Sequence, residues 1–203
     1  MIRSIIIYPD PVLARKCEDV SFPLHSDVLR LLDDMVETMM AARGAGLAAP
    51  QVGFNLRLVT LMVERAGPDG GTEFVPLKLV NPRITKRQGK RQVREGCLSL
   101  PGYFENVQRS TYVEVQGFDE TGAKVELGAD GKLAQALEHE IEHLDGITFV
   151  DHLSLIKRNM ARTKFTKAKA KGLRYQSSSP PPQDFTELAP PTKISEPVIG
   201  LKE

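Results

Sequence analysis

The stretch from Leu56 to Leu127 constrains the fold most strongly, because it consists of short runs of residues that favour β-strands. These runs include LRLVTLMV, FVPLKLV and TYVEVQGF, and they are separated by Gly, Pro, Asn and Asp residues that favour turns. The sequence DETG, from Asp119 to Gly122, predicts a hairpin turn. The middle of the chain is therefore expected to form a mostly antiparallel sheet.

Helical patterns lie on both sides of this region. Ser26 is expected to be the N-cap of a first helix, whose apolar residues recur at helical spacing until the sequence RGAG ends the pattern. Asp130 is expected to cap a second helix over residues 131–145, which Gly146 ends, and a third helix is predicted over residues 153–171. We therefore predict an α+β fold, with mostly antiparallel sheets around the central second helix, an N-terminal helix and a C-terminal helix.

The composition is typical of a single globular domain, with 203 residues, 41% apolar and 26% charged residues, and a net charge of +1. We expect this domain at residues 1–174 and an extended or disordered tail at residues 175–203, which hold six of the 14 prolines. No apolar run is long enough to span a bilayer, and the first residues do not resemble a signal peptide. With only two cysteines a disulfide framework is not expected, and a cytoplasmic location fits.

The predicted second helix contains the sequence LEHEIEHLDG, an HExxH pattern in which His139 and His143 are four residues apart and Glu140 follows the first. On a helical wheel these three residues border an apolar stripe. The stripe consists of Leu133, Leu137, Ile141 and Leu144. The other polar residues, Gln135, Glu138, Glu142 and Asp145, are expected to face water. A divalent cation would compensate a buried carboxylate beside two imidazoles; the alternative is that the histidines form core hydrogen bonds and Glu140 is half exposed.

A metal site of this kind needs a third ligand, and Cys97 is the residue that best supplies it. The position at which a third histidine would follow the helix is occupied by Phe149, and residues 153–175 contain no acid. Cys97 lies in the Gly-flanked sequence REGCLSLPG between two predicted strands, where its thiolate and the following backbone amide can face one site. The alternative for a lone cysteine is a small, inert core residue, and this interpretation is retained for Cys17.

Three protein ligands leave one position for water, which is typical of a catalytic site. Glu140 is then the group that accepts a proton from that water, and the chemistry indicated is hydrolysis at a carbonyl. The sequence GAGLAAPQVG, residues 44–53, is a candidate for donors to a developing oxyanion, because its glycines permit close backbone approach and Gln51 carries an uncharged amide. The alternative for this stretch is a plain loop between a helix and a strand.

Three of these sequences together resemble one family, the peptide deformylases. GAGLAAPQVG, EGCLSLPG and HEIEHLDG are similar to the three signature motifs of that family in order and spacing, YPDPVL is similar as well, and the resemblance covers about Ile5 to Lys164. The resemblance implies that Cys97, His139 and His143 are metal ligands and that Glu140 is the general acid and base. It also implies that Gln51 and the backbone amide of Leu98 are oxyanion donors and that Gly46 lines the substrate cleft.

The resemblance also implies the reaction and its metal. The family removes the formyl group from the N-terminal formyl-methionine of newly synthesised proteins and releases formate. Its usual metal is Fe(II), and Zn(II), Ni(II) or Co(II) are alternatives that a thiolate and imidazole set also accepts. Two positions depart from the common pattern: Glu138 stands where many relatives have glutamine, and Glu142 stands where aspartate is common.

Residues 157–174 carry eight Lys and Arg residues and no acid. The family's C-terminal helix is thought to dock at the ribosome, so the resemblance implies salt-sensitive contacts between this segment and RNA phosphates. The alternative is a solvated helix face that contacts no partner. Two other functions compete with the hydrolase: a non-catalytic His2Cys metal-binding or electron-transfer protein, which leaves Glu140 unexplained, and a pseudoenzyme, which the complete set of site residues argues against.

Overall fold

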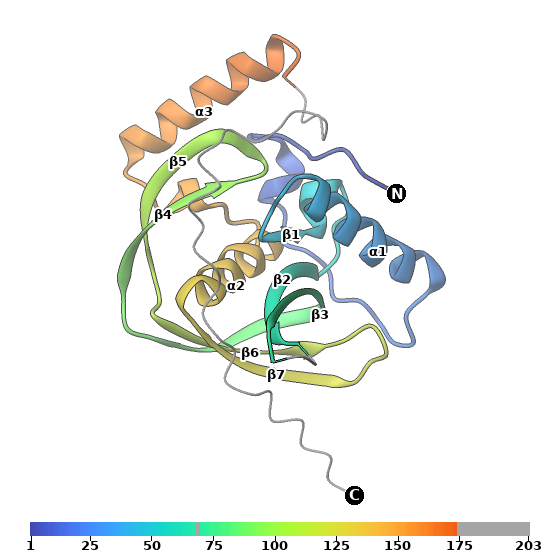
Figure 1. Cartoon of the computed structure of the whole chain (residues 1–203). Coiled ribbons are helices and arrows are strands. Elements are labelled where there is room, and N and C mark those ends of the chain that lie inside the picture. Colours follow the sequence, from blue (N-terminus) through green and yellow to red (C-terminus); the bar gives the residue numbers. More distant parts are fainter. Residues whose placement is uncertain (68–69, 174–203) are drawn as a thin grey trace, which may run out of the picture.

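The computed structural model describes residues 1–67 and 70–173, and its strands form two antiparallel sheets (Figure 1). The larger sheet has the strand order β1-β2-β3-β6-β7, and β4 pairs with β5 in a separate two-stranded sheet. The strands are β1 (Gly46–Ala48), β2 (Leu58–Ala66), β3 (Thr72–Gln88), β4 (Arg91–Cys97), β5 (Leu100–Arg109), β6 (Tyr112–Phe118) and β7 (Lys124–Asp130). The predicted α+β fold with mostly antiparallel sheets is confirmed.

The helices lie close to the predicted ranges. They are α1 (Ser26–Ala41), α2 (Gly131–Leu144) and α3 (Leu155–Ala170), with short 3-10 segments η1 (Pro11–Ala14), η2 (Ala49–Val52) and η3 (Phe149–His152). The predicted N-cap of the first helix was wrong: Ser26 is already helical, and the ring of His25 accepts a hydrogen bond from the backbone of Asp27. The third helix begins later than predicted, because η3 precedes it and Ser154 caps α3.

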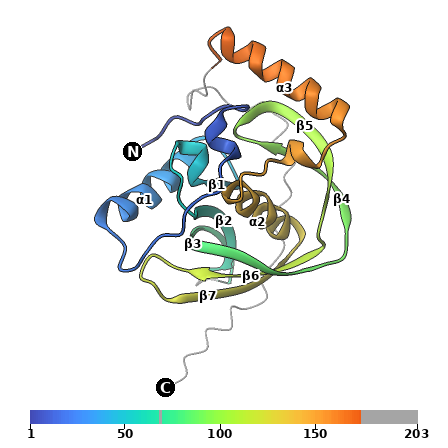
Figure 2. The ribbon, with the colours of Figure 1, turned by 180° about the vertical axis from the view of Figure 1, so that it is seen from behind.

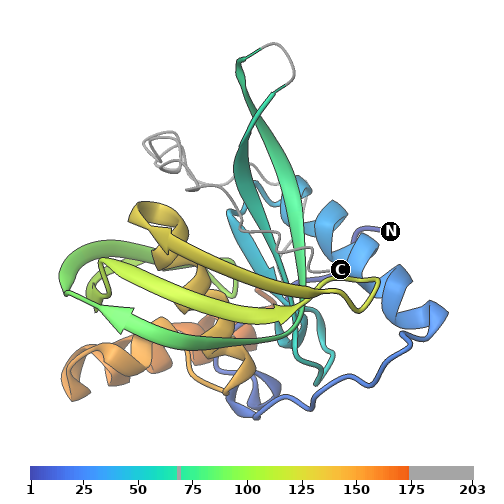
Figure 3. The same ribbon diagram turned by 90° about the horizontal axis from the view of Figure 1, so that it is seen from below.

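The long strand β3 is the central strand of the larger sheet. Its first half pairs with β2, and its second half pairs with β6 after a register shift between Val80 and Arg83. Figure 3 shows the β2–β3 hairpin extending away from the rest of the molecule. The predicted turn joins β6 to β7, where the Asp119 carboxylate accepts hydrogen bonds from the backbone of Thr121 and Ala123.

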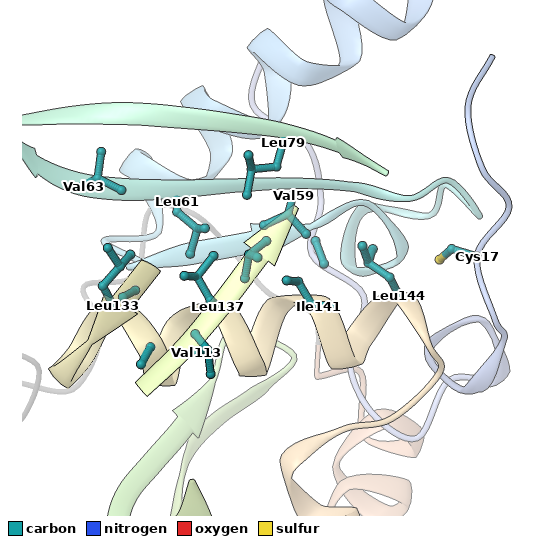
Figure 4. Packing of buried hydrophobic residues seen from close by; sticks show 14 residues of the cluster. Cys17, Val59, Leu61, Val63, Leu79, Val113, Leu133, Leu137, Ile141 and Leu144 are labelled. Atoms are coloured by element: carbon teal, nitrogen blue, oxygen red, sulfur yellow. The ribbon is translucent and has the colours of Figure 1, made fainter. Parts of the chain in front are cut away.

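Helix α2 packs its apolar stripe against the larger sheet. Figure 4 shows the helix residues facing side chains of β2 and β3. The helix contributes Leu133, Leu137, Ile141 and Leu144, and the strands contribute Val59, Leu61, Val63 and Leu79. These side chains are almost fully removed from water, so their burial fixes which way the remaining faces of α2 point.

The prediction that four polar residues of this helix face water was wrong for Glu138, which is 4% exposed. Its carboxylate accepts hydrogen bonds from the backbone and hydroxyl of Ser110, both at 2.8 Å, and from Arg87 at 3.1 Å. Glu142 is also largely covered, whereas Asp145 is exposed. A helical wheel assumes one covered face, but α2 also meets the segment after β5, so its flanks are buried and their acids are paired.

Among the described residues, no helix is long and apolar enough to cross a membrane. The predicted tail at residues 175–203 lies outside the part of the chain that the structure describes.

Candidate metal centre

Cys97, His139 and His143 lie together, with one ligand atom from each within 4.8 Å of the others. Cys97 ends β4, and the two histidines occupy successive turns of α2, so their rings project from the same side of the helix. Sγ of Cys97 is 3.2 Å from Nε2 of His143, and all three residues are buried. Donors of a tetrahedral ion with bonds of about 2.0–2.3 Å stand roughly 3.5 Å apart, so the three residues fit one metal ion.

Gln51 lies beside the cysteine and is held in one orientation. Its Oε1 atom accepts a hydrogen bond from the backbone of Ala48 at 2.8 Å, which turns its Nε2 atom toward the site. That nitrogen donates to Sγ of Cys97 at 3.4 Å and to the hydroxyl of Ser99 at 3.3 Å. Leu98, between these two residues, is in the turn that joins β4 to β5. An amide donor therefore points at the same place as the three ligand atoms.

Glu140 is the least satisfied acid of the site. It is 5% exposed, and its Oε2 atom has no hydrogen-bond partner within the described residues. Burial and the nearby charge of Glu95 raise the pKa of Glu140 to about 7, although His139 acts in the opposite direction. A carboxyl group in this state can accept and return a proton near neutral pH.

Gly46, in the edge strand β1, leaves the space that Glu140 occupies. A Cβ atom at this position would lie 2.6 Å from Cγ and Oε1 of Glu140, which no side chain could tolerate without displacing the acid. A Cβ atom at Gly44 would likewise lie 2.8 Å from the side chain of Leu98. Gly44 and Gly46 therefore let the backbone at β1 approach the site closely.

Glu95 was not identified from the sequence, although it contacts a candidate metal ligand directly. Its Oε1 atom is 2.6 Å from Nδ1 of His139, and Arg109 binds both of its oxygens at 2.6 and 2.8 Å. Burial raises the pKa of Glu95, but His139 and Arg109 outweigh this and lower it to about 2. Strand alternation could have found it, because Glu95 and Cys97 are two residues apart and lie on one face of β4.

The two histidines have opposite electrostatic environments. Burial lowers the pKa of His139, but Glu95 and Cys97 outweigh it and raise that pKa well above its ordinary value. Burial next to His139 lowers the pKa of His143 well below its ordinary value. A carboxylate that holds Nδ1 of a histidine leaves Nε2 to face the ligand position, which is the usual arrangement behind a metal-binding imidazole.

The site thus combines a thiol, two imidazoles, an amide donor and a buried carboxyl group with one oxygen that has no partner among the described residues. Three ligands with one open position, together with an acid that is not itself a ligand, can activate water. The amide of Gln51 can donate to an oxygen that gains negative charge. Together these groups suit hydrolysis at a carbonyl carbon.

The chain is similar to known proteins over most of its length. A family model described as polypeptide deformylase matches residues 2–159. The chain is 48% identical over 152 residues to a peptide deformylase of Dehalococcoides mccartyi strain CBDB1, which covers 75% of this chain and 86% of that protein. It is 44% identical over 164 residues to a peptide deformylase of Thermodesulfovibrio yellowstonii, covering 81% of this chain and 96% of that protein.

Solved structures agree with the sequence comparison. A peptide deformylase from Legionella pneumophila has a TM-score of 0.74 at 39% identity, covering 85% of this chain and 98% of that chain. A peptide deformylase from Ehrlichia chaffeensis in complex with actinonin has a TM-score of 0.74 at 37% identity, covering 83% of this chain and 98% of that chain.

Proposed function

The chain belongs to the peptide deformylase family, and we propose that Cys97, His139 and His143 hold the metal ion of this reaction while Glu140 moves its protons. The protein removes the formyl group from the N-terminal formyl-methionine of newly synthesised proteins and releases formate. The observation that carries the assignment of roles is Glu140, which is buried next to His139 and whose Oε2 atom has no hydrogen-bond partner in the part of the chain that the structure describes.

The residues present fit a single divalent ion. One thiolate and two imidazoles suit Fe(II), Zn(II), Ni(II) and Co(II), and Fe(II) is our proposal for the native ion because it is usual in the family. When bound, the metal supplies a Lewis acid that polarises the formyl oxygen and lowers the pKa of water at the open position. The remaining chemistry belongs to side chains and backbone groups of this chain.

Glu140 is the proposed general base and general acid. Its carboxylate accepts a proton from the attacking water as the new C–O bond forms at the formyl carbon. It then delivers the proton to the methionine nitrogen as the C–N bond breaks, so the products are formate and a free amino group. Such proton transfer is worth roughly 10²–10⁴ in rate.

Gln51 and the backbone N–H of Leu98 are the proposed donors to the formyl oxygen as it gains negative charge. The 3.4 Å contact between Nε2 of Gln51 and Cys97 supports this, because it directs the amide toward the ligand atoms. Gly46 is proposed to line the substrate cleft, supported by its close contact with Glu140. An unbranched methionine side chain would suit apolar surroundings at this point.

We further propose that residues 1–174 form the catalytic domain, that the protein works in the cytoplasm, and that α3 contacts the ribosome. The sequence 157–174 is basic, and α3 buries only Ala161 and Phe165, so most of its surface is open to a partner. The exposed apolar residues Leu155, Ile156 and Met160 lie on the same helix. Contacts with RNA phosphates would hold the enzyme near nascent chains.

A formate-release assay combined with metal analysis tests the assignment of roles. Purified protein is expected to contain about one divalent ion per chain and to release formate from a formyl-methionyl peptide. Removal of the ion by a chelator should abolish release, and re-addition should restore it. Protein that binds metal through this site but releases no formate would instead favour a non-catalytic metal-binding protein.

A further inference from the structure

Arg109, the last residue of β5, is almost fully buried and has acids on both sides. Its Nε and Nη2 atoms donate to the two carboxylate oxygens of Glu95 at 2.8 and 2.6 Å. Its Nη1 atom donates to Oε2 of Glu142 on α2 at 2.7 Å. One guanidinium group therefore joins strand β4 to helix α2 from a position on β5.

A histidine completes this cluster at its outer edge. Nε2 of His152, in η3, is 2.8 Å from the same oxygen of Glu142 and 3.4 Å from Nη1 of Arg109. The side chain of Glu142 is 13% exposed and that of His152 is 34% exposed. The contacts thus run from the edge of the molecule at His152 to the buried carboxylate of Glu95.

The inner end of the cluster reaches a candidate metal ligand. Oε1 of Glu95 contacts both Nη2 of Arg109 and Nδ1 of His139, each at 2.6 Å. His139 and Glu142 are three residues apart on α2, so Arg109 holds this turn of the helix directly through Glu142 and indirectly through Glu95. Arg109 therefore connects to the His139 ring through Glu95 without touching the ring itself.

We propose that Arg109 and Glu142 are positioning residues that slow the loss of the metal ion, because they hold Glu95 against His139. This role rests on the proposed ligand set and concerns metal retention rather than catalysis. Lysine could not replace Arg109, because a single ammonium group lacks the planar fork that binds both carboxylates at once. Glu142 contacts both Arg109 and His152 through its Oε2 atom.

The chain contains a matched control on the same helix. Glu138 is also a buried acid next to a candidate ligand in sequence, and it too binds an arginine, Arg87. Its other partner is Ser110, and within the described residues no hydrogen bond or ion pair joins Glu138 to Glu95 or to the ring of His139. Loss of charge at Glu138 should therefore affect stability without affecting the orientation of that ring.

The test compares Glu142→Gln, Arg109→Lys and Glu138→Gln in the zinc-loaded protein, with the rate of zinc transfer to a chromophoric chelator as the readout. Glu142→Gln and Arg109→Lys are expected to release zinc faster than the unsubstituted protein, by up to about the 10–100-fold that loss of a direct partner of a metal ligand costs in affinity, because both loosen Glu95, the partner of His139. Glu138→Gln is expected to release zinc at the unsubstituted rate, even if its melting temperature falls.

The cobalt-substituted proteins give a second readout that folding stability alone would not change. The visible spectrum should shift in Glu142→Gln and stay unchanged in Glu138→Gln, because only the former alters the ligand geometry. Glutamine at position 142 removes the charge that pairs with Arg109 but keeps the size of the side chain, so this variant keeps the test valid if Arg109→Lys does not fold. Equal zinc release from Glu142→Gln and Glu138→Gln, or unsubstituted rates from both Glu142→Gln and Arg109→Lys, would overturn the proposal.

Discussion

Helices α2 and α3 are of similar length but differ in how far they are buried. Nine of the 14 residues of α2 are buried, against two of the 16 residues of α3. Figures 1 and 2 show α3 beside β5, at the edge of the molecule opposite the larger sheet. The ionisable residues of α2 therefore have environments set by their neighbours, whereas those of α3 mostly face solvent and can meet a partner.

The contacts of α3 with the rest of the molecule are few and come from one side of the helix. Phe165 packs edge-on against Tyr8 and Tyr103, and the ammonium of Lys164 lies 5.3 Å from the centre of the Tyr103 ring. This narrow stripe is enough to dock the helix without burying its charges. The comparison leads to a clear division: substitutions at the α2 residues that form or contact the candidate metal centre should change metal binding or catalysis, and substitutions on the exposed side of α3 should not.

The largest effect is expected for Glu140→Gln, which keeps the shape of the side chain but removes its ability to accept a proton. Deformylation should fall by roughly 10²–10⁴, as expected when a general base is removed, while bound metal is retained. The measurement is the formate-release rate alongside the metal content of the same preparation. Loss of metal in this variant would mean that Glu140 is a ligand, and the proposed division of roles would be wrong.

A second effect should separate the two cysteines, both of which are buried. Cys97→Ser replaces a soft ligand by a poor one, and it should weaken metal binding by more than the 10–100-fold typical when an outer partner is removed. Cys17→Ser should leave metal affinity unchanged, because burial raises the pKa of Cys17 to about 11 and keeps its thiol neutral. Competition with a chelator measures both, and equal decreases would contradict the assignment of Cys97.

A third effect concerns the stability of the metal-free protein. The pKa of Glu140 is about 7 in the folded chain and 4.5 as its ordinary value, so between these pH values the folded state holds a proton that the unfolded state has released. Rising pH should therefore destabilise the metal-free protein relative to Glu140→Gln, by on the order of 3 kcal/mol in total.

Urea unfolding of both metal-free proteins across this pH range measures the difference directly. The stability advantage of Glu140→Gln should be absent below the unfolded value of 4.5 and complete above about 7. A difference that does not change with pH would show that the folded site does not hold a proton on Glu140.

The fold could be predicted well where local pattern decides the structure. The apolar stripe of α2, the DETG turn and the approximate positions of three helices follow from spacing and turn chemistry, and they are confirmed. The separate β4–β5 sheet was not predicted, because strand runs alone do not specify which strands pair. The cap at His25 was missed because imidazole is an uncommon N-cap residue.

The candidate site shows the same limit. Cys97, His139 and His143 were selected from chemistry and spacing, and the structure brings their ligand atoms together, whereas the proposed catalytic roles remain predictions. Glu95 and Arg109 were missed because their ion pair joins residues 14 apart whose proximity depends on the register of β4 and β5. The error at Glu138 arose because the wheel takes no account of the partners Arg87 and Ser110.

Charge changes on the exposed side of α3 are expected to have no effect on catalysis. Lys157 and Lys169 already bind Glu105 and Asp10, at 2.7 and 2.9 Å. No ion pair within the described residues involves Lys167 or Lys171, and both are exposed. The latter two lysines are therefore among the residues of α3 whose charge is available to RNA phosphates.

Lys167→Gln with Lys171→Gln should weaken binding to ribosomes and reduce the slope of log affinity against log salt by about 0.7–0.9 for each phosphate that the helix no longer neutralises. The matched pair, Lys157→Gln with Lys169→Gln, removes the same charge but should change the slope less, because these lysines are already paired with acids. Hydrolysis of a short formyl-methionyl peptide should be the same in both double variants and in the unsubstituted protein. If ribosome affinity does not change with salt or with the substitution of Lys167 and Lys171, α3 is a solvated surface that does not bind RNA. If either double variant loses peptide hydrolysis, the proposed separation of roles between α2 and α3 is wrong.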